Sequence, residues 1–531
     1  MRPRRLSGHG RVRFLVFILV LLGSVLPAPQ VQCAALLERG AAITDPLSLR
    51  QLDRGRFGLS RVLMPMRSAD APIANSQLFA LPSMAPVRKA LDDEFERYVA
   101  RHNADQPGET IGVGSAYDLQ LFDRALLYSP DSRFVLAGII NRMDRAYLSE
   151  ANCGEVRLIY RLTRTDGAAT GDAATSPRLP MTLNVVLKAK ADHAATRDGA
   201  AITCAEIARR WLATADSPLT GARLAEELLS SDGPLDLIEP EHIDLIETNL
   251  QIAHAPKSAT RDFRTDYLLK VFHYNARNRM FEQVPLENQI DRERILSDDH
   301  LKRDFRAWLL DVRHIGELDR GTILIPEKFL ATAAIAATPA GFAASNLQPA
   351  FGLVQGDDAN ADPVFKESDV VAALKKASEN GVDLQNIRSL AGFERRLNDV
   401  TCSGCHQTRG IGGFHFPGVD WMATHPSNST VVPASPHFFG DQIRRRDILM
   451  SLRDGRRPDY SRGFSGRPQL RGSTELAGTE YDDGWGAHCY QQKPDAADND
   501  RSFRSWTCAE GLACQVVGNA SRVGMCFVKS R

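Results

Sequence analysis

The residues Cys402-Ser403-Gly404-Cys405-His406 read C-x-x-C-H, which is the most specific chemical signal in the 531-residue sequence. Two thiols at this spacing reach the two vinyl groups on one edge of a porphyrin, and the adjacent histidine is placed under the iron as an axial ligand. We therefore predict one covalently attached haem c, held through Cys402 and Cys405, with His406 as the proximal ligand.

Three other interpretations of the motif stay open. A redox dithiol of thioredoxin type requires a strand before the first cysteine, whereas residues 387–400 carry apolar side chains at helical spacing. A zinc site requires four nitrogen or sulfur ligands, so histidines such as His415 would have to complete the set. The pattern is also short enough to arise by chance. The helical pattern before the motif and the glycine-rich segment after it favour haem.

The first 35 residues predict export from the cytoplasm. Five arginines among the first thirteen residues precede an apolar run over residues 14–26, which is too short to span a bilayer comfortably. Cys33-Ala34-Ala35 then offers a cleavage site of small residues. We expect a signal peptide over residues 1–35, no transmembrane span after it, and a location in the periplasm or at the cell surface of a bacterium. An uncleaved N-terminal anchor is the alternative.

The cysteine count agrees with an oxidising compartment. Of nine cysteines, removal of Cys33 with the signal peptide and of the two motif thiols leaves six, which can pair as three disulfides. Four of them lie in residues 484–531, a stretch too short to bury a sufficient core without cross-links. The disulfides that we predict are Cys153–Cys204, Cys489–Cys514 and Cys508–Cys526.

The length suggests several domains, and the first half of the chain has the pattern of paired strands. Strand-like content and partial alternation occur over residues 156–162, 181–187, 243–252 and 267–274. In the last segment Leu269, Val271 and His273 would share one face. Paired strands favour an α+β domain with a mainly antiparallel sheet over a doubly wound parallel one.

The segment from residue 366 to 455 resembles the c-type cytochromes. A helix that leads to C-x-x-C-H, a loop with glycine and proline after it, and a final helix from about residue 441 follow the order of their small three-helix fold. The resemblance implies an all-α haem domain. The wider chain is similar to large exported bacterial proteins of an otherwise uncharacterised family, through residues 153–157 and 402–409, and this similarity implies no activity.

The expected organisation is a multidomain chain with these parts in order. They are a signal peptide (1–35), an irregular N-terminal arm (36–85), an α+β domain (86–330), a linker (331–365), an all-α cytochrome c-like domain (366–455), a second linker (456–483) and a disulfide-rich module (484–531).

The sixth ligand of the iron is the open point of the resemblance. In the c-type cytochromes a methionine in the loop before the last helix commonly fills this position. Met422 lies in the expected loop, although unusually close to His406, and His415 is a candidate of equal rank. Met450 falls inside the predicted final helix and ranks below them. An open sixth position is the remaining alternative.

Two arginine clusters, residues 444–446 and 456–457, lie near the expected haem segment. Because guanidinium forks match carboxylates, these arginines are candidates for binding haem propionates. A solvated helix face is the simpler interpretation of such a charge run.

Charge and motifs limit the possible functions. Lys plus Arg and Asp plus Glu both number 65, so the net charge gives no reason to expect nucleic-acid binding. The motifs H-E-x-x-H, G-x-S-x-G and G-x-x-x-x-G-K-[ST] are absent from the sequence, and its single C-x-x-C-H disfavours a peroxidase with a second haem. We expect an exported electron-transfer protein with an unknown redox partner protein, rather than a catalyst. The alternative is a secreted ligand- or partner-binding protein whose C-x-x-C-H segment is structural or binds zinc.

Overall fold

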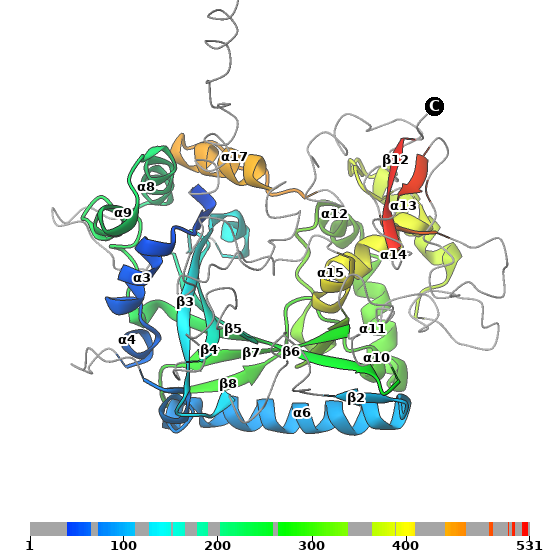
Figure 1. Cartoon of the computed structure of the whole chain (residues 1–531). Coiled ribbons are helices and arrows are strands. Elements are labelled where there is room, and N and C mark those ends of the chain that lie inside the picture. Colours follow the sequence, from blue (N-terminus) through cyan, green and yellow to red (C-terminus); the bar gives the residue numbers. More distant parts are fainter. Residues whose placement is uncertain are drawn as a thin grey trace, which may run out of the picture.

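The structure is a computed structural model of the chain (Figure 1). It describes residues 40–64, 73–111, 127–149, 152–164, 178–189, 202–258, 264–337, 364–387, 389–408, 441–462, 488–491, 508, 512–515 and 523–528. Three parts can be distinguished in these residues. They are a nine-stranded sheet with helices packed on it, a helical unit, and a three-stranded sheet near the C-terminus.

The large sheet is antiparallel in all its described pairings. Its main path runs β1-β3-β4-β5-β6-β7-β8, while β2 pairs with β6 and β9 pairs with β7. The strands are β1 (Ala42–Ile43), β2 (Glu109–Ile111), β3 (Ser132–Arg142), β4 (Glu155–Arg164), β5 (Arg178–Lys188), β6 (Ile243–Pro256), β7 (Arg264–Asn275), β8 (Met280–Val284) and β9 (Ala334–Ala337). The prediction of a mainly antiparallel α+β sheet is confirmed, and the four predicted strand segments lie in β4 to β7.

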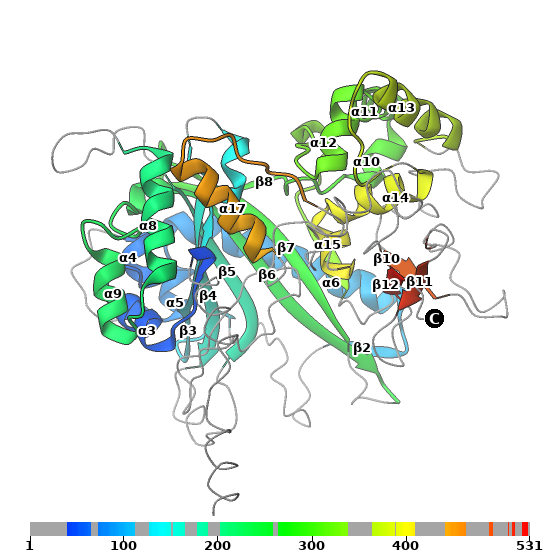
Figure 2. The same ribbon diagram turned by 90° about the horizontal axis from the view of Figure 1, so that it is seen from above.

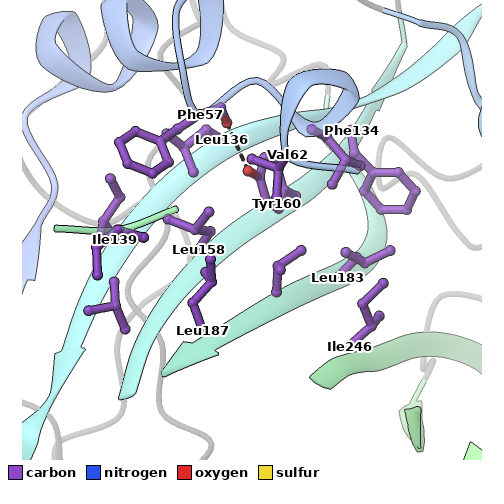
Figure 3. Packing of buried hydrophobic residues seen from close by; sticks show 14 of the residues in the cluster. Phe57, Val62, Phe134, Leu136, Ile139, Leu158, Tyr160, Leu183, Leu187 and Ile246 are labelled. Carbon is purple, nitrogen blue, oxygen red and sulfur yellow. Dashed lines mark hydrogen bonds between the residues drawn. The ribbon is translucent and has the colours of Figure 1, made fainter. Parts of the chain in front are cut away.

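One face of the sheet packs on the main hydrophobic core (Figure 3). On β4 the side chains of Leu158 and Tyr160 point into this core, together with Leu183 of β5 and Ile246 of β6. The hydroxyl of Tyr160 donates a hydrogen bond of 2.8 Å to the carbonyl oxygen of Phe57, which ties the strand to the chain that follows α3 (Pro46–Arg54).

The opposite face of the sheet is buried as well. Arg157, which alternates with the core residues of β4, is buried, and so is Glu247 of β6. Leu269 and Val271 of β7 pack on this second face against Cys402. Because side chains of a strand alternate between its two faces, the residues that form the main core and those that meet the C-x-x-C-H segment come from the same strands.

Residues 36–85, for which we predicted an irregular arm, contain helices in their described part. These are α3, α4 (Leu59–Leu63), α5 (Asn75–Leu78) and the 3-10 turn η1 (Pro82–Met84). The carboxylate of Asp45 caps α3 by accepting from the backbone N–H of Ser48 at 2.8 Å. Pro46 and Pro82 stand at the N-termini of α3 and η1, where the missing N–H has no helical partner to lose.

Three further helices pack in the sheet domain. Helix α6 (Ala85–Asp105) lies along the sheet in Figure 1, while α8 (Cys204–Asp216) and α9 (Gly221–Leu229) lie beside α3. Cys204, the first residue of α8, forms a disulfide with Cys153 just before β4, which is the pairing that we predicted. This bond joins the helix to the sheet across 51 residues of chain.

A separate core holds the helical unit. Its helices are α10 (Arg292–Ser297), α11 (Asp299–Leu309), α12 (Val312–Arg320), α13 (Glu367–Glu379) and α14 (Leu390–Asp399). Phe305, Phe365 and Phe393 come together in this core from three different segments. The structure therefore differs from the predicted boundary at residue 330, because residues 292–320 pack with α13 and α14, whereas β9, inside the predicted linker 331–365, returns to the sheet.

Helix α17 (Gln442–Arg453) does not pack with α13 and α14 as the third helix of a small haem domain. Figure 2 shows it beside α8, and its Leu449 is part of the main core of the sheet domain. The guanidinium of Arg444 is 3.2 Å from Asp144, which follows β3, and this buried ion pair fixes the helix to the sheet domain. An all-α cytochrome domain that ends with this helix is therefore absent from the described residues.

The predicted arginine clusters have protein partners. Arg444 and Arg445 both contact the carboxylate of Asp441, at 2.5 and 2.9 Å. Arg456 lies 3.2 Å from Asp454. Neither interpretation from the sequence describes Arg444, which is buried in a protein ion pair instead of binding propionates or facing solvent.

The C-terminal module is a small antiparallel sheet. Strand β12 (Val523–Val528) lies between β10 (His488–Tyr490) and β11 (Leu512–Gln515). Cys489 and Cys514 form the predicted disulfide across it, and Cys508 is also disulfide-bonded. Among the described residues, no helix has the length and apolar character that crossing a bilayer requires. The predicted signal peptide, residues 1–35, lies outside the described residues.

Candidate functional site

The C-x-x-C-H residues begin a short helix, α15 (Cys402–Thr408), directly after α14. Thr401 starts this helix, because its hydroxyl accepts from the backbone N–H of Gly404 at 3.0 Å and its carbonyl accepts from Cys405 N–H at 2.9 Å. A Ser/Thr cap of this kind satisfies N–H groups that the first helical turn leaves without partners. The two cysteines stand three residues apart on a helix and so lie on the same side of it.

Gly404 is required by the close approach of α14. A Cβ atom at this position would lie 2.0 Å from the carbonyl oxygen of Asn398, far inside van der Waals contact. The x-G-C part of the motif therefore permits the tight corner between α14 and α15, and this corner sets the direction in which the cysteine side chains leave the backbone.

We expect Gly404→Ala to lower the free energy of unfolding by about 1–3 kcal/mol, which is the usual cost of adding a methyl group to a close-packed site. Gly108→Ala is the control, because a Cβ there meets no atom within 4 Å. Chemical denaturation followed by circular dichroism measures both. Equal midpoints for the two variants would contradict the packing assigned to Gly404.

Helix α15 is bound to the sheet domain through Gln289, which precedes α10. The Oε1 atom of Gln289 accepts from the backbone N–H of Ser403 at 3.0 Å, and its Nε2 donates to the Ser403 hydroxyl at 3.2 Å. In Figures 1 and 2, α15 lies between the sheet and the helical unit. The motif is thus held at the junction of the two cores rather than within one of them.

Both motif cysteines are buried, and neither forms a disulfide. Cys402 packs among Leu269, Val271 and Leu286, with its sulfur 3.7 Å from the Glu287 carbonyl oxygen. Burial, and then the negative charges of Glu287 and Glu247, raise the pKa of the Cys402 thiol well above its usual value. A reactive dithiol of thioredoxin type has a lowered thiol pKa and follows a strand, whereas this thiol is stabilised as S–H and follows a helix.

Cys402 lines a cavity of about 520 Å³ between the sheet and the helical unit. This volume is within the range of roughly 300–1,000 Å³ that small-molecule and cofactor sites occupy. Its apolar wall includes Leu245, Val271, Val284 and Val400. As we predicted for β7, Val271 and His273 share a face, and this is the face that meets the cavity.

Charged residues form the other wall of the cavity. Arg157 lies 2.8 Å from Glu247 and 2.9 Å from Glu155, and Arg145 lies 3.1 Å from Glu155 and 2.5 Å from Glu287. Burial raises the pKa of Glu155, but the guanidiniums of Arg145 and Arg157 outweigh it and lower that pKa to about 2. Glu247 differs, because its burial prevails and raises its pKa.

The lowered pKa of Glu155 predicts that the stability of the folded protein falls in acid. Since the folded pKa of Glu155 is about 2 and its ordinary value 4.5, its contribution is present above pH 4.5 and is lost as the pH falls toward 2. A shift of this size corresponds to about 3 kcal/mol. We expect Glu155→Gln to lower the unfolding free energy at pH 6 and to flatten its fall between pH 5 and pH 3, measured by urea denaturation. An unchanged slope would show that other carboxylates govern this range.

A second ion-pair group reaches the same cavity from the chain after α17. Arg462, which lines the cavity, lies 2.6 Å from Asp144, and Arg142 lies 2.8 Å from the same carboxylate. The Arg142 and Asp144 side chains are almost completely buried. The arginines beside the cavity are therefore Arg145, Arg157 and Arg462, instead of the clusters singled out from the sequence.

The candidate haem ligands have different positions. His406 lies in α15 next to Cys405, and the structure describes its backbone only. His415 and Met422 lie outside the described residues. Met450 lies on α17 and packs against the main core of the sheet domain, whereas Cys402 belongs to the cluster on the opposite face.

A covalently bound porphyrin needs two thiols outside any disulfide and a cavity beside them, and the described residues supply both thiols and a cavity beside Cys402. The two thiols lie on one side of a helix and are not cross-linked to each other, and one of them lines a cavity with an apolar wall and guanidinium groups. In the described part of the chain, no group of three His, Cys, Asp or Glu ligands includes either cysteine, and His415, the histidine named for a zinc site, lies outside that part.

Sequence reasoning missed another group of ligand-type side chains, His102, Glu109 and His254, which the structure brings together from α6, β2 and β6. No spacing rule could have joined residues from three elements. Comparison with known protein families, curated proteins and solved structures finds no match to the chain.

Proposed function

We propose that the chain is an exported electron-transfer protein that carries one haem c, bound through Cys402 and Cys405 with His406 as the proximal ligand. The iron of a bound haem would supply the chemistry by exchanging one electron between its ferrous and ferric states. The observation that carries the proposal is the pair of buried cysteines, outside any disulfide, on a capped helix whose first residue, Cys402, lines a cavity.

The chain would contribute fixed geometry at this site. Thr401 and Gly404 set the start of α15, and Gln289 holds Ser403, so the two sulfurs are presented from a rigid helix. The apolar wall formed by Leu245, Val271 and Val284 would exclude water from one side of the cofactor. A dry and preorganised site is one of the means by which a protein sets a reduction potential.

The guanidinium groups would receive the propionates. Arg462 lines the same cavity as Cys402, and Arg145 and Arg157 lie on the charged wall. Each of these arginines already has a carboxylate partner in the protein, so it is held in position before a ligand arrives. Charges that are fixed in this way need little rearrangement when one electron is gained or lost.

The sixth position of the iron stays with the candidates Met422 and His415, or remains open, because Met450 packs against the main core on the opposite face of the sheet from Cys402. The electron-transfer proposal also implies a redox partner protein, which exchanges the electron with the haem. Export to the periplasm or cell surface is part of the proposal, and the disulfides Cys153–Cys204 and Cys489–Cys514 support it, because such bonds persist in oxidising compartments.

The alternative function, a secreted binding protein, would use the same cavity for an uncharged or charged small ligand without covalent attachment. Metal analysis separates the two. Protein exported from a host with haem-maturation machinery should contain one iron per chain and show a Soret band. Zinc, or no metal together with unmodified thiols at Cys402 and Cys405, would favour the binding protein.

A further inference from the structure

Three potential metal ligands converge at one end of helix α6, far along the chain from the C-x-x-C-H motif. His102 lies in the last turn of α6, Glu109 begins β2, and His254 lies near the end of β6. The Oε2 atom of Glu109 is 3.2 Å from Nε2 of His102 and 2.5 Å from Nδ1 of His254. The three ligand atoms all lie within 4.8 Å of one another.

The surroundings orient His254 toward this point. Its second ring nitrogen, Nε2, faces Oδ2 of Asp266 on β7 at 3.6 Å, and the hydroxyl of Tyr98 donates to the same oxygen at 2.9 Å. A carboxylate behind a ligating histidine is the usual second layer of a zinc site, because it holds the ring with its proton on the far nitrogen. In that tautomer the near nitrogen has a lone pair that can bind a metal ion.

Each ring nitrogen that faces Glu109 can either donate an N–H to the carboxylate or, with its proton on the other nitrogen, bind a metal ion held between the three side chains. A proton on His254 would serve the contact with Glu109. His102, whose side chain is buried beside the same carboxylate, offers the second imidazole, with its Nε2 facing Glu109. A metal ion uses the lone pairs of both rings at once.

We propose that His102, Glu109 and His254 bind a zinc ion, with Asp266 and Tyr98 as positioning residues. Zinc accepts two imidazoles and a carboxylate, with bonds of about 2.0–2.2 Å. Tetrahedral ligands at that bond length lie roughly 3.4 Å apart, so the pair at 3.2 Å fits and the pair at 2.5 Å has to open slightly. Glu109 is the most exposed of the three and can make this adjustment.

The site leaves a fourth coordination position for water and connects α6, β2 and β6. Residue His254 pairs across the strands with Ile111 of β2. Binding of the metal would therefore stabilise the end of the sheet where the short strand β2 joins it. The expected consequence is a rise in the thermal unfolding temperature when zinc is added, since a ligand that binds only the folded state stabilises it.

The test uses the full chain, stripped with a chelator and dialysed against zinc. Zinc and iron are counted per chain in the same samples, so the result is independent of the haem proposal. We expect about one zinc in the wild type and a higher unfolding temperature with zinc. His102→Gln and His254→Gln should lose both effects, and Asp266→Asn should weaken zinc binding by about 10- to 100-fold, as for other residues behind zinc ligands.

His300→Gln is the matched control, because His300 is an exposed histidine whose contact is a single aspartate at 3.8 Å. It should bind zinc like the wild type. Circular dichroism confirms that each variant is folded. The proposal is overturned if the wild type and His254→Gln contain equal amounts of zinc. It is also overturned if the wild type neither retains zinc nor gains stability from it, and the three side chains then form a hydrogen-bonded network only.

Discussion

Replacing both motif cysteines, Cys402→Ser/Cys405→Ser, should abolish covalent haem in the exported protein. Thioether bonds survive denaturation, so the wild type keeps its haem stain on a denaturing gel and the double variant shows none. A single replacement leaves one possible bond and should reduce the stain without removing it. Buried serine hydroxyls at both positions disturb little volume, which makes loss of attachment separable from loss of fold.

The control removes two other cysteines. Cys489→Ser/Cys514→Ser breaks the disulfide of the C-terminal sheet, which lies in a separate part of the chain from the cavity beside Cys402. This variant should retain the stain. A haem stain that persists in Cys402→Ser/Cys405→Ser would exclude covalent attachment at this motif. So would a wild type without stain when a known cytochrome made in the same cells is stained.

The second large effect concerns stability. Cys153→Ser/Cys204→Ser should lower the unfolding free energy of the sheet domain by about 4 kcal/mol, because in the chain-entropy model this is the gain from closing a loop of such length. The loop spans 51 residues, and the disulfide joins Cys204, the first residue of α8, to Cys153, just before β4. Residue Cys153 is completely buried in the main core.

Guanidinium denaturation of the oxidised protein measures this change, with tryptophan fluorescence as the probe. Trp211 of α8 is buried in the main core and reports on the helix that the disulfide holds. Cys489→Ser/Cys514→Ser is again the control and should leave the transition of the sheet domain in place. A midpoint for Cys153→Ser/Cys204→Ser that equals the wild type would mean that packing alone holds α8.

The sheet was predictable because its signal is local. Alternation of apolar residues along β4 to β7 follows from the two faces of a strand, and Val271 and His273 fall on the predicted face. Disulfide pairing was predictable for Cys153 and Cys204 because the alternatives were few. In each case residues close in sequence, or a small set of possibilities, carried the information.

The errors arise where packing partners are distant in sequence. Helix α17 has an apolar face that suits either core, and nothing in its sequence indicates that Arg444 pairs with Asp144, 300 residues earlier. For the same reason α10 to α12 were assigned to the sheet domain although Phe305 packs with Phe365. The arginines of the cavity wall and the ligands of the proposed zinc site belong to this class, because long-range contacts alone bring them together.

The most direct test of the central claim is the mass of the proteolytic peptide that contains residues 402–406, taken from protein exported with haem-maturation machinery. We predict a peptide heavier by one haem, with both cysteines protected from alkylation. A peptide at its unmodified mass, with both thiols open to alkylation after unfolding, would contradict it.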